Sequence, residues 1–225
     1  MAYQERTSMS KKDFFFGILA GLLIGLLFLP TLKAAKPDLY EKFAMFIVPF
    51  FLIGTPVGLI VARAIGNRIA IVWQVAKFGV IGVLNTLVDL GVLALITFVI
   101  RSTAHIEAKT ELLIIGATVV TYYSLYKAVS FVVANINSYF WNKYWTFNQN
   151  PDKKTQAQFL QFFAVSIIGF IINVLVASAI FKTMGTFSGF SEDQQGLIGA
   201  AAGSIIGLAW NFIGYKFIVF KEKTI

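Results

Sequence analysis

Polar side chains recur inside the apolar stretches that make up most of residues 77–220 of this chain. Amides and hydroxyls both donate and accept hydrogen bonds, and lysine ammonium groups add a positive charge. Such groups are costly to place in lipid, so they mark where a membrane protein does its work; the alternative is that they bond to neighbouring helices and only hold the bundle together. The candidate ligand-binding residues are Asn85, Asp89, Lys127, Asn137, Asn142, Lys143, Asn173, Asn211, Tyr215 and Lys216.

Two of these residues, Asp89 and Lys127, place a charge deep within an apolar stretch. Asp89 lies twelve residues after Lys77, and Lys127 lies sixteen residues before Lys143. In helices these spacings put the two charges about 18 and 24 Å from one membrane edge, a difference that a lysine side chain can span. We therefore expect Asp89 and Lys127 to pair, the alternative being that Lys127 snorkels to the opposite surface.

Most of these residues belong to two consecutive copies of one sequence pattern. Residues 77–147 and 161–220 each contain two apolar stretches and end in an aromatic and basic tail, NKYWTF in the first copy and YKFIVF in the second. Aligning the copies pairs Lys77 with Gln161, Asp89 with Asn173, Asn142 with Tyr215, Lys143 with Lys216 and Phe147 with Phe220. Polar positions that recur in tandem copies are typical of transporters built from structural repeats.

The composition predicts an integral membrane protein. Hydrophobic residues make up 57% of the chain, charged residues only 13%, and the mean hydropathy is +0.75. Six apolar stretches can span a hydrocarbon core of about 30 Å. They cover residues 14–30, 44–65, 78–100, 121–141, 159–181 and 197–217. The expected fold is all-α with six transmembrane helices, and the apolar residues 112–120 should lengthen the fourth helix or form an interfacial turn.

The basic residues indicate membrane topology rather than a nucleic-acid partner. The net charge is +8, and the lysines and arginines fall at the ends of the apolar stretches, twelve on one side and six on the other, with only Lys127 inside a stretch. This bias predicts cytoplasmic termini. The two copies then insert in the same direction, related by a rotation about the membrane normal, and bring Lys143 and Lys216 to the level of the cytoplasmic lipid headgroups. With no cysteine in the chain, no thiolate metal site is expected, and we assign no metal ligands.

Glycines spaced four residues apart predict close helix packing in three of the spans. They are Gly17, Gly21 and Gly25 in the first span, Gly54 and Gly58 in the second, and Gly199, Gly203 and Gly207 in the sixth. Because the first two spans lie outside the repeats, we predict an amino-terminal transmembrane hairpin over residues 1–74 and a four-helix domain over residues 75–225.

The segments KFGVIGVLNTLVDLG, ANINSYFWNKYWTF and WNFIGYKFIVFK resemble the GtrA-like family of small four-helix membrane proteins. The resemblance covers roughly residues 75–221 and implies a role in glycosylating cell-surface polymers, through movement of polyprenyl-phosphate-linked monosaccharides across the cytoplasmic membrane. Related domains also occur fused to polyprenyl-phosphate sugar synthases. The chain departs from the family in three respects. It has an extra amino-terminal hairpin, it has Ser138 where the family usually has Asn, and it has Tyr215 at the position that aligns with Asn142 of the first copy.

The function expected on this resemblance is a passive flippase for a polyprenyl-phosphate sugar. Connections between the apolar stretches are too short for a catalytic domain and contain no P-loop, so we expect neither enzymatic activity nor a cofactor, and sugar transfer would occur in a partner glycosyltransferase. Two alternatives are a non-transporting subunit of such a transferase and a small proton-coupled cation exporter centred on Asp89. Besides the lipid-linked sugar and membrane lipids, further copies of the chain are a candidate partner.

Overall fold

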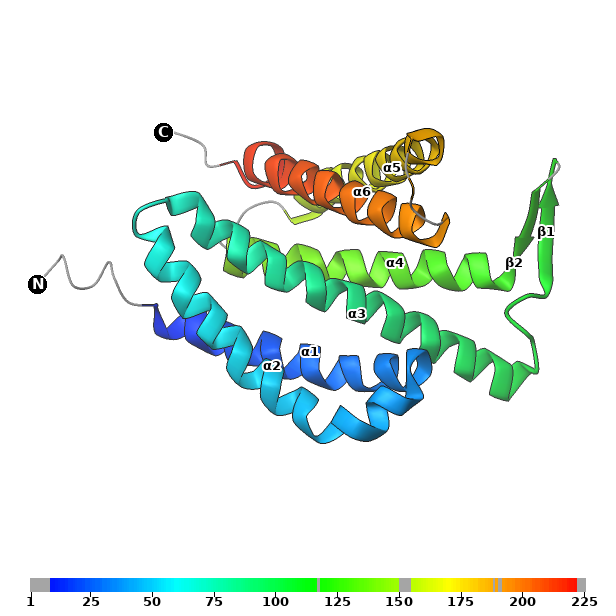
Figure 1. Cartoon of the computed structure of the whole chain (residues 1–225), viewed down its shortest axis with the longest axis horizontal. Helices are drawn as coiled ribbons and strands as arrows, with labels where there is room; N and C mark the ends of the chain where they lie inside the picture. The colour runs from blue at the N-terminus through cyan, green and yellow to red at the C-terminus, as the bar shows by residue number, and fades with distance from the viewer. Residues whose placement is uncertain (1–8, 117, 150–154, 188, 190–191, 222–225) are drawn as a thin grey trace, which may run out of the picture. The chain divides into compact units, whose positions relative to one another are not determined.

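A computed structural model describes residues 9–116, 118–149, 155–187, 189 and 192–221. The described chain divides into two compact units, residues 1–148 and residues 149–225 (Figure 1). Helices dominate both units. The first unit contains α1 to α4, and the second contains α5 and α6.

In the first unit, α1 (Lys11–Ala35) and α2 (Pro37–Gly66) form an antiparallel hairpin joined at Lys36. Glycines of α1 allow the two backbones to approach closely, since a Cβ atom at Gly21 would lie 2.3 Å from the carbonyl oxygen of Phe51. The prediction for the α1 glycines is therefore confirmed. The prediction for Gly54 and Gly58 is wrong, because a Cβ atom at either position would meet no described atom within 4 Å.

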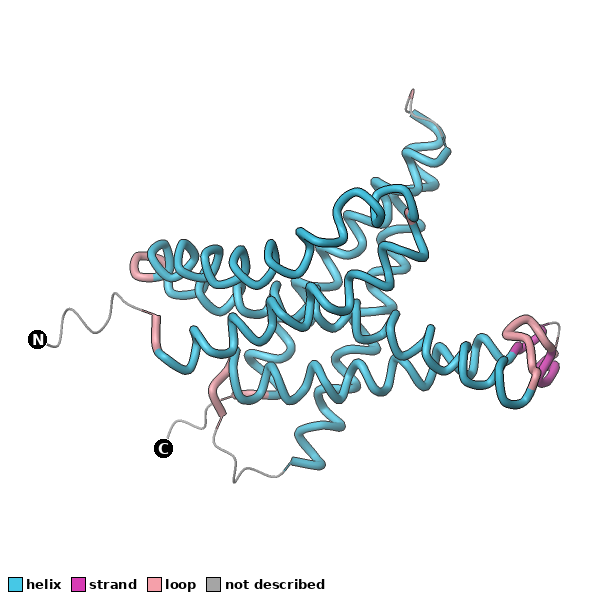
Figure 2. Tube along the Cα trace, turned by 90° about the horizontal axis from the view of Figure 1, so that it is seen from below, coloured by secondary structure: helices cyan, strands magenta, loops and turns pink. Residues whose placement is uncertain are grey.

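The third helix, α3 (Ala70–Ala104), is connected to α4 (Tyr122–Trp141) through an antiparallel β-hairpin. Its strands are β1 (Glu111–Ile115) and β2 (Thr118–Thr121), and Gly116 between them has a φ of 59°. The strands run across the axes of α3 and α4 (Figures 1 and 2). The expectation of a longer fourth helix over residues 112–120 is therefore wrong, whereas the alternative of a turn agrees with the chain reversal at Gly116, and its place at the membrane interface stays a prediction. Isoleucines and valines around a glycine favour strands and a reversal of the chain over a helix.

The core of the first unit joins the amino-terminal hairpin to α3 and to the end of α4. One buried cluster contains Ala20 of α1, Leu59 of α2, Trp73 and Ile81 of α3, and Trp145 beyond α4. A second cluster joins Ile24 of α1 to Leu84 and Leu87 of α3. The hairpin therefore packs on the first repeat as part of one unit. The domain boundary between residues 74 and 75 stays a prediction.

In the second unit, α5 (Thr155–Phe187) packs against α6 (Glu192–Gly214) through the glycine face of α6. Cβ atoms at Gly199, Gly203 and Gly207 would lie 2.7, 2.4 and 2.9 Å from carbonyl oxygens of α5. Only residues without a side chain allow this approach, so the packing predicted for these glycines is confirmed.

Five helical segments in the described chain are long and apolar enough to cross a membrane: α1, α2, α3, residues 156–184 of α5, and residues 194–219 of α6 and the turn after it. The fourth helix is not among them, although its 20 residues are sufficient in length. The chain is thus a helical multi-pass membrane protein, with the β-hairpin as its departure from an all-α fold. A sixth span and the cytoplasmic location of the termini stay predictions.

Candidate ligand-binding site in the membrane helices

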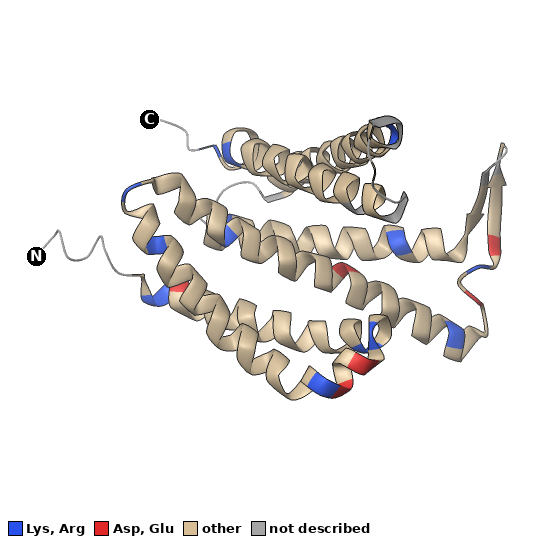
Figure 3. Ribbon diagram, viewed as in Figure 1, with Lys and Arg blue, Asp and Glu red and all other residues tan. Residues whose placement is uncertain are grey.

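An ion pair inside the first unit joins α3 to α4. The Lys127 ammonium donates to Asp89 Oδ2, and the Ser130 hydroxyl donates to Asp89 Oδ1 over 2.6 Å. Most other charged residues of this unit lie near the helix ends (Figure 3). The expected pairing of Asp89 with Lys127 is confirmed, and Lys127 does not snorkel away from it. Its side chain is 41% exposed, which leaves it accessible to a ligand.

Two amides beside this ion pair have unused hydrogen-bonding capacity. Asn85 Oδ1 on α3 and Asn137 Nδ2 on α4 are buried and have no partner in the described chain. On α3, Asn85 lies one turn before Asp89. On α4, Asn137 lies about two turns after Ser130. Unpaired polar atoms are costly inside a membrane protein. Together with the ion pair, they give α3 and α4 unfilled hydrogen-bonding capacity, which is the chemistry that a hydroxyl-bearing ligand requires.

A π-helical turn, η1 (Asn142–Thr146), follows α4 and carries two more candidate residues. It closes where the Phe147 amide donates to the Asn142 carbonyl over 2.9 Å. The side chain of Asn142 donates to the Ser138 carbonyl and leaves its own buried Oδ1 without a described partner. Lys143 is fully buried, and its ammonium lies 5.5 Å from the ring centres of Tyr139 and Tyr144. Such π-turns are frequent at functional sites.

The second unit repeats this turn in η2 (Tyr215–Val219) after α6. The Phe220 amide donates to the Tyr215 carbonyl over 2.8 Å. The Lys216 ammonium lies 5.8 Å from the ring centre of Phe212 and 5.6 Å from that of Phe217. These rings stand four residues before and one residue after the lysine, as Tyr139 and Tyr144 do around Lys143. The aligned tails therefore form the same local structure, a π-turn with a lysine between two aromatic rings. The convergence of Lys143 and Lys216 on one ligand stays a prediction.

The remaining candidates of the second unit lie between α5 and α6. The Tyr215 hydroxyl and Ser166 Oγ share a hydrogen bond of 2.6 Å. Asn173 Nδ2 lies 3.5 Å from Ser204 Oγ, at the limit of a hydrogen bond. Asn211 Oδ1 is buried without a described partner, in the space that a Cβ atom at Gly169 would occupy. This pair of helices thus also carries unfilled hydrogen-bonding capacity.

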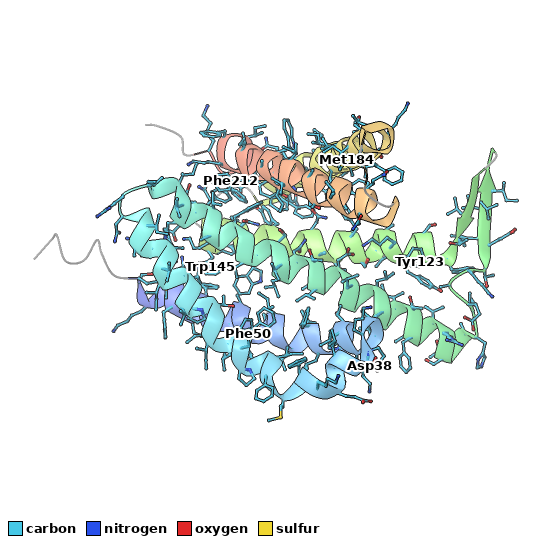
Figure 4. All side chains as sticks on the ribbon, in the orientation of Figure 1. Asp38, Phe50, Tyr123, Trp145, Met184 and Phe212 are labelled. Atoms are coloured by element: carbon cyan, nitrogen blue, oxygen red, sulfur yellow. The ribbon has the colours of Figure 1, made fainter. Side chains whose placement is uncertain are left out.

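One buried polar cluster was missed by the sequence analysis. Asp13 of α1 accepts hydrogen bonds from Trp145 Nε1 over 3.0 Å and from Lys77 Nζ over 3.4 Å. Trp145, labelled in Figure 4, lies in the interior of the first unit. A serine three residues before Asp13 signals the start of a helix, but nothing in the sequence connects Asp13 with residues 64 and 132 positions away.

The family model described as GtrA/DPMS, transmembrane domain, matches residues 77–220. The chain belongs to this family. Comparisons with curated proteins and with solved structures found no match. The matched range begins at Lys77 and ends at Phe220, as the internal repeat does, so it contains the ion pair and both π-turns. The resemblance stated from the sequence is confirmed, and it places the chain among membrane proteins that handle lipid-linked sugars.

Proposed function

We propose that the chain is a passive translocase for a polyprenyl-phosphate-linked monosaccharide used in cell-surface glycoconjugate synthesis. The observation that carries the proposal is the ion pair of Asp89 with Lys127, together with the unpartnered amides of Asn85 and Asn137 on the same two helices. This arrangement puts charge and unfilled hydrogen-bonding capacity in the middle of α3 and in α4, and ionisable groups within a membrane protein of this kind favour a functional site.

The chemistry of the ligand accounts for these groups. A sugar hydroxyl that enters hydrocarbon without a partner costs about 4–8 kcal/mol, and a phosphodiester adds a charge. Carboxylate, ammonium and amide groups inside α3 and α4 replace part of the lost water, so the barrier falls. Movement down a gradient, set by synthesis on one face and consumption on the other, requires no nucleotide.

Reconstituted vesicles test the proposal directly. Vesicles that contain a polyprenyl-phosphate monosaccharide in both leaflets are treated from outside with an impermeant reagent that modifies the sugar. With the protein present, we expect the reagent to reach the inner-leaflet pool without ATP. Protein-free vesicles, and vesicles with heat-denatured protein, should expose only the outer pool. If native protein gives the same result as these controls, the chain is not a translocase.

Lys143 and Lys216 are the proposed phosphate ligands. Charge-assisted hydrogen bonds contribute about 1.5–3 kcal/mol, so replacing either lysine by glutamine should weaken binding of the lipid-linked sugar roughly tenfold. The matched control is Lys221→Gln, since Lys221 is exposed beyond η2. Binding is measured by titrating labelled lipid into purified protein in detergent. Equal and negligible effects at all three positions would mean that the lysines serve topology alone.

The alternatives make different predictions at Asp89. A non-transporting transferase subunit, suggested by the related domains that occur fused to polyprenyl-phosphate sugar synthases, would keep transferase activity after replacement of Asp89, Asn85 or Asn137. A proton-coupled cation exporter needs a carboxylate that exchanges ligands. Both oxygens of Asp89 are engaged by Lys127 and Ser130, which disfavours this reading.

A further inference from the structure

The two π-turns accept hydrogen bonds from different kinds of side chain near their ends. In the second unit, neutral amides provide the cap: Gln158 Nε2 donates to the Val219 carbonyl over 3.1 Å, and Gln149 Nε2 donates to the Phe220 carbonyl over 3.0 Å. In the first unit, a cation caps η1 one carbonyl earlier, since Lys77 Nζ donates to the carbonyl of Trp145, the next-to-last residue of the turn, over 2.9 Å. The residue aligned with Lys77 in the second repeat is the neutral Gln161.

A cationic cap in this position requires a counter-ion. The Lys77 side chain is only 7% exposed, and an unpaired ammonium at that burial is strongly unfavourable. The carboxylate of Asp13 lies 3.4 Å from Lys77 Nζ and accepts the indole N–H of Trp145 through the same oxygen. Ser10 Oγ donates to the second oxygen over 2.6 Å, which fixes the carboxylate at the start of α1.

The counter-ion comes from outside the family domain. The family match begins at Lys77 itself, whereas Asp13 belongs to the amino-terminal hairpin. We propose that Asp13 is the positioning residue of η1: it neutralises Lys77, anchors Trp145, and so holds the turn that carries Asn142 and Lys143. The amino-terminal hairpin therefore supplies the counter-ion that the charged side chain of Lys77 requires and that a neutral amide would not require.

The experiment compares Asp13→Asn, Lys77→Gln and the double variant in the full chain. Asp13→Asn keeps the size of the side chain but leaves Lys77 without its counter-ion, so the apparent melting temperature should fall by about 5 °C or more. Lys77→Gln removes the positive charge and leaves a neutral amide at this position, so no counter-ion is needed. The double variant should then recover most of the lost melting temperature. Asp38→Asn, an exposed carboxylate in the first turn of α2, is the matched control and should change nothing.

A second readout reports on the turn itself. In protein labelled with 5-fluorotryptophan, the ¹⁹F resonance assigned to Trp145 through Trp145→Phe should shift in Asp13→Asn. Binding of the lipid-linked sugar should weaken in parallel, and this last consequence alone rests on the proposed function. If wild-type protein binds no such lipid, the function fails, while the melting and ¹⁹F results still decide the role of Asp13.

Two results would overturn the proposal. One is an Asp13→Asn protein whose melting temperature and Trp145 resonance match those of wild type. The other is a double variant no more stable than Asp13→Asn, because a loss that does not depend on the charge of Lys77 belongs to α1 packing. If Asp13→Asn cannot be purified as folded protein, a folded double variant supports the proposal and an unfolded one refutes it.

Discussion

Replacing Asp89 by asparagine is expected to lower the free energy of unfolding by about 1–3 kcal/mol and to abolish most lipid translocation. The substitution leaves the half-exposed Lys127 ammonium without its counter-ion, and the cost of about 2.5–3.5 kcal/mol for a lysine at the centre of a spanning helix is the upper limit of this effect. The Ser130 hydroxyl also loses a charged acceptor. Unfolding is measured by titration from mild detergent into sodium dodecyl sulfate, and translocation in the vesicle assay.

A double-variant cycle separates the stability effect from the functional effect. Lys127→Gln alone leaves the Asp89 carboxylate without its counter-ion, whereas the double variant Asp89→Asn with Lys127→Gln removes both charges. The free energy of unfolding of the double variant should therefore fall by less than the sum of the two single losses. Translocation should stay low, because no charge remains to meet the ligand. The control is Arg101→Gln, which breaks an ion pair with Glu107 whose side chains are 68% and 51% exposed, and should cost at most about 1 kcal/mol. A double variant that transports normally would exclude Asp89 and Lys127 from the site.

Replacing Gly21 by alanine is expected to destabilise the first unit by about 2–3 kcal/mol. The new Cβ atom would lie 2.3 Å from the Phe51 carbonyl oxygen, and since this is a backbone atom, α1 and α2 must move apart to relieve the contact. Gly203→Ala should act similarly on α5 and α6, with its Cβ 2.4 Å from the Asn173 carbonyl oxygen.

The control substitution lies in the same hairpin as Gly21. Gly58→Ala introduces a Cβ atom with no described atom within 4 Å, and alanine favours a helix over glycine by about 1 kcal/mol. We expect Gly58→Ala to be neutral or stabilising in the same detergent titration. A loss at Gly58 as large as the loss at Gly21 would indicate that α2 packs through Gly58 against a further helix, such as one from a second copy of the chain.

Sequence patterns predicted the features that depend on local periodicity. The helices follow from runs of apolar residues, and the repeated tail predicted that Lys143 and Lys216 occupy equivalent turns. The depth argument predicted the pairing of Asp89 with Lys127, since an isolated charge in lipid needs a partner and the chain offers few. These inferences need only the spacing of residues along a helix and the low polarity of the surroundings.

Features that depend on which face meets which neighbour were not predicted. Gly21 and Gly58 belong to identical four-residue spacings, yet only Gly21 contacts another helix, and spacing alone contains no information about direction. The link between Asp13 and Lys77 spans 64 positions, so no local pattern reveals it. The β-hairpin did have a local signal, in the β-branched residues on both sides of Gly116, but its apolar character favoured a helix in a chain otherwise composed of spans.

The ion pair also constrains the order in which this chain can be built. Five helical segments of the described chain are apolar enough to partition into lipid by themselves, while α4, with Lys127 and its asparagines, is not among them. If α4 is the sixth span, Asp89 lowers the cost of bringing Lys127 into lipid, and α3 emerges from the ribosome first. We then expect the nascent α4 to leave the translocon alongside α3, as one cooperative helical pair joined by the β-hairpin.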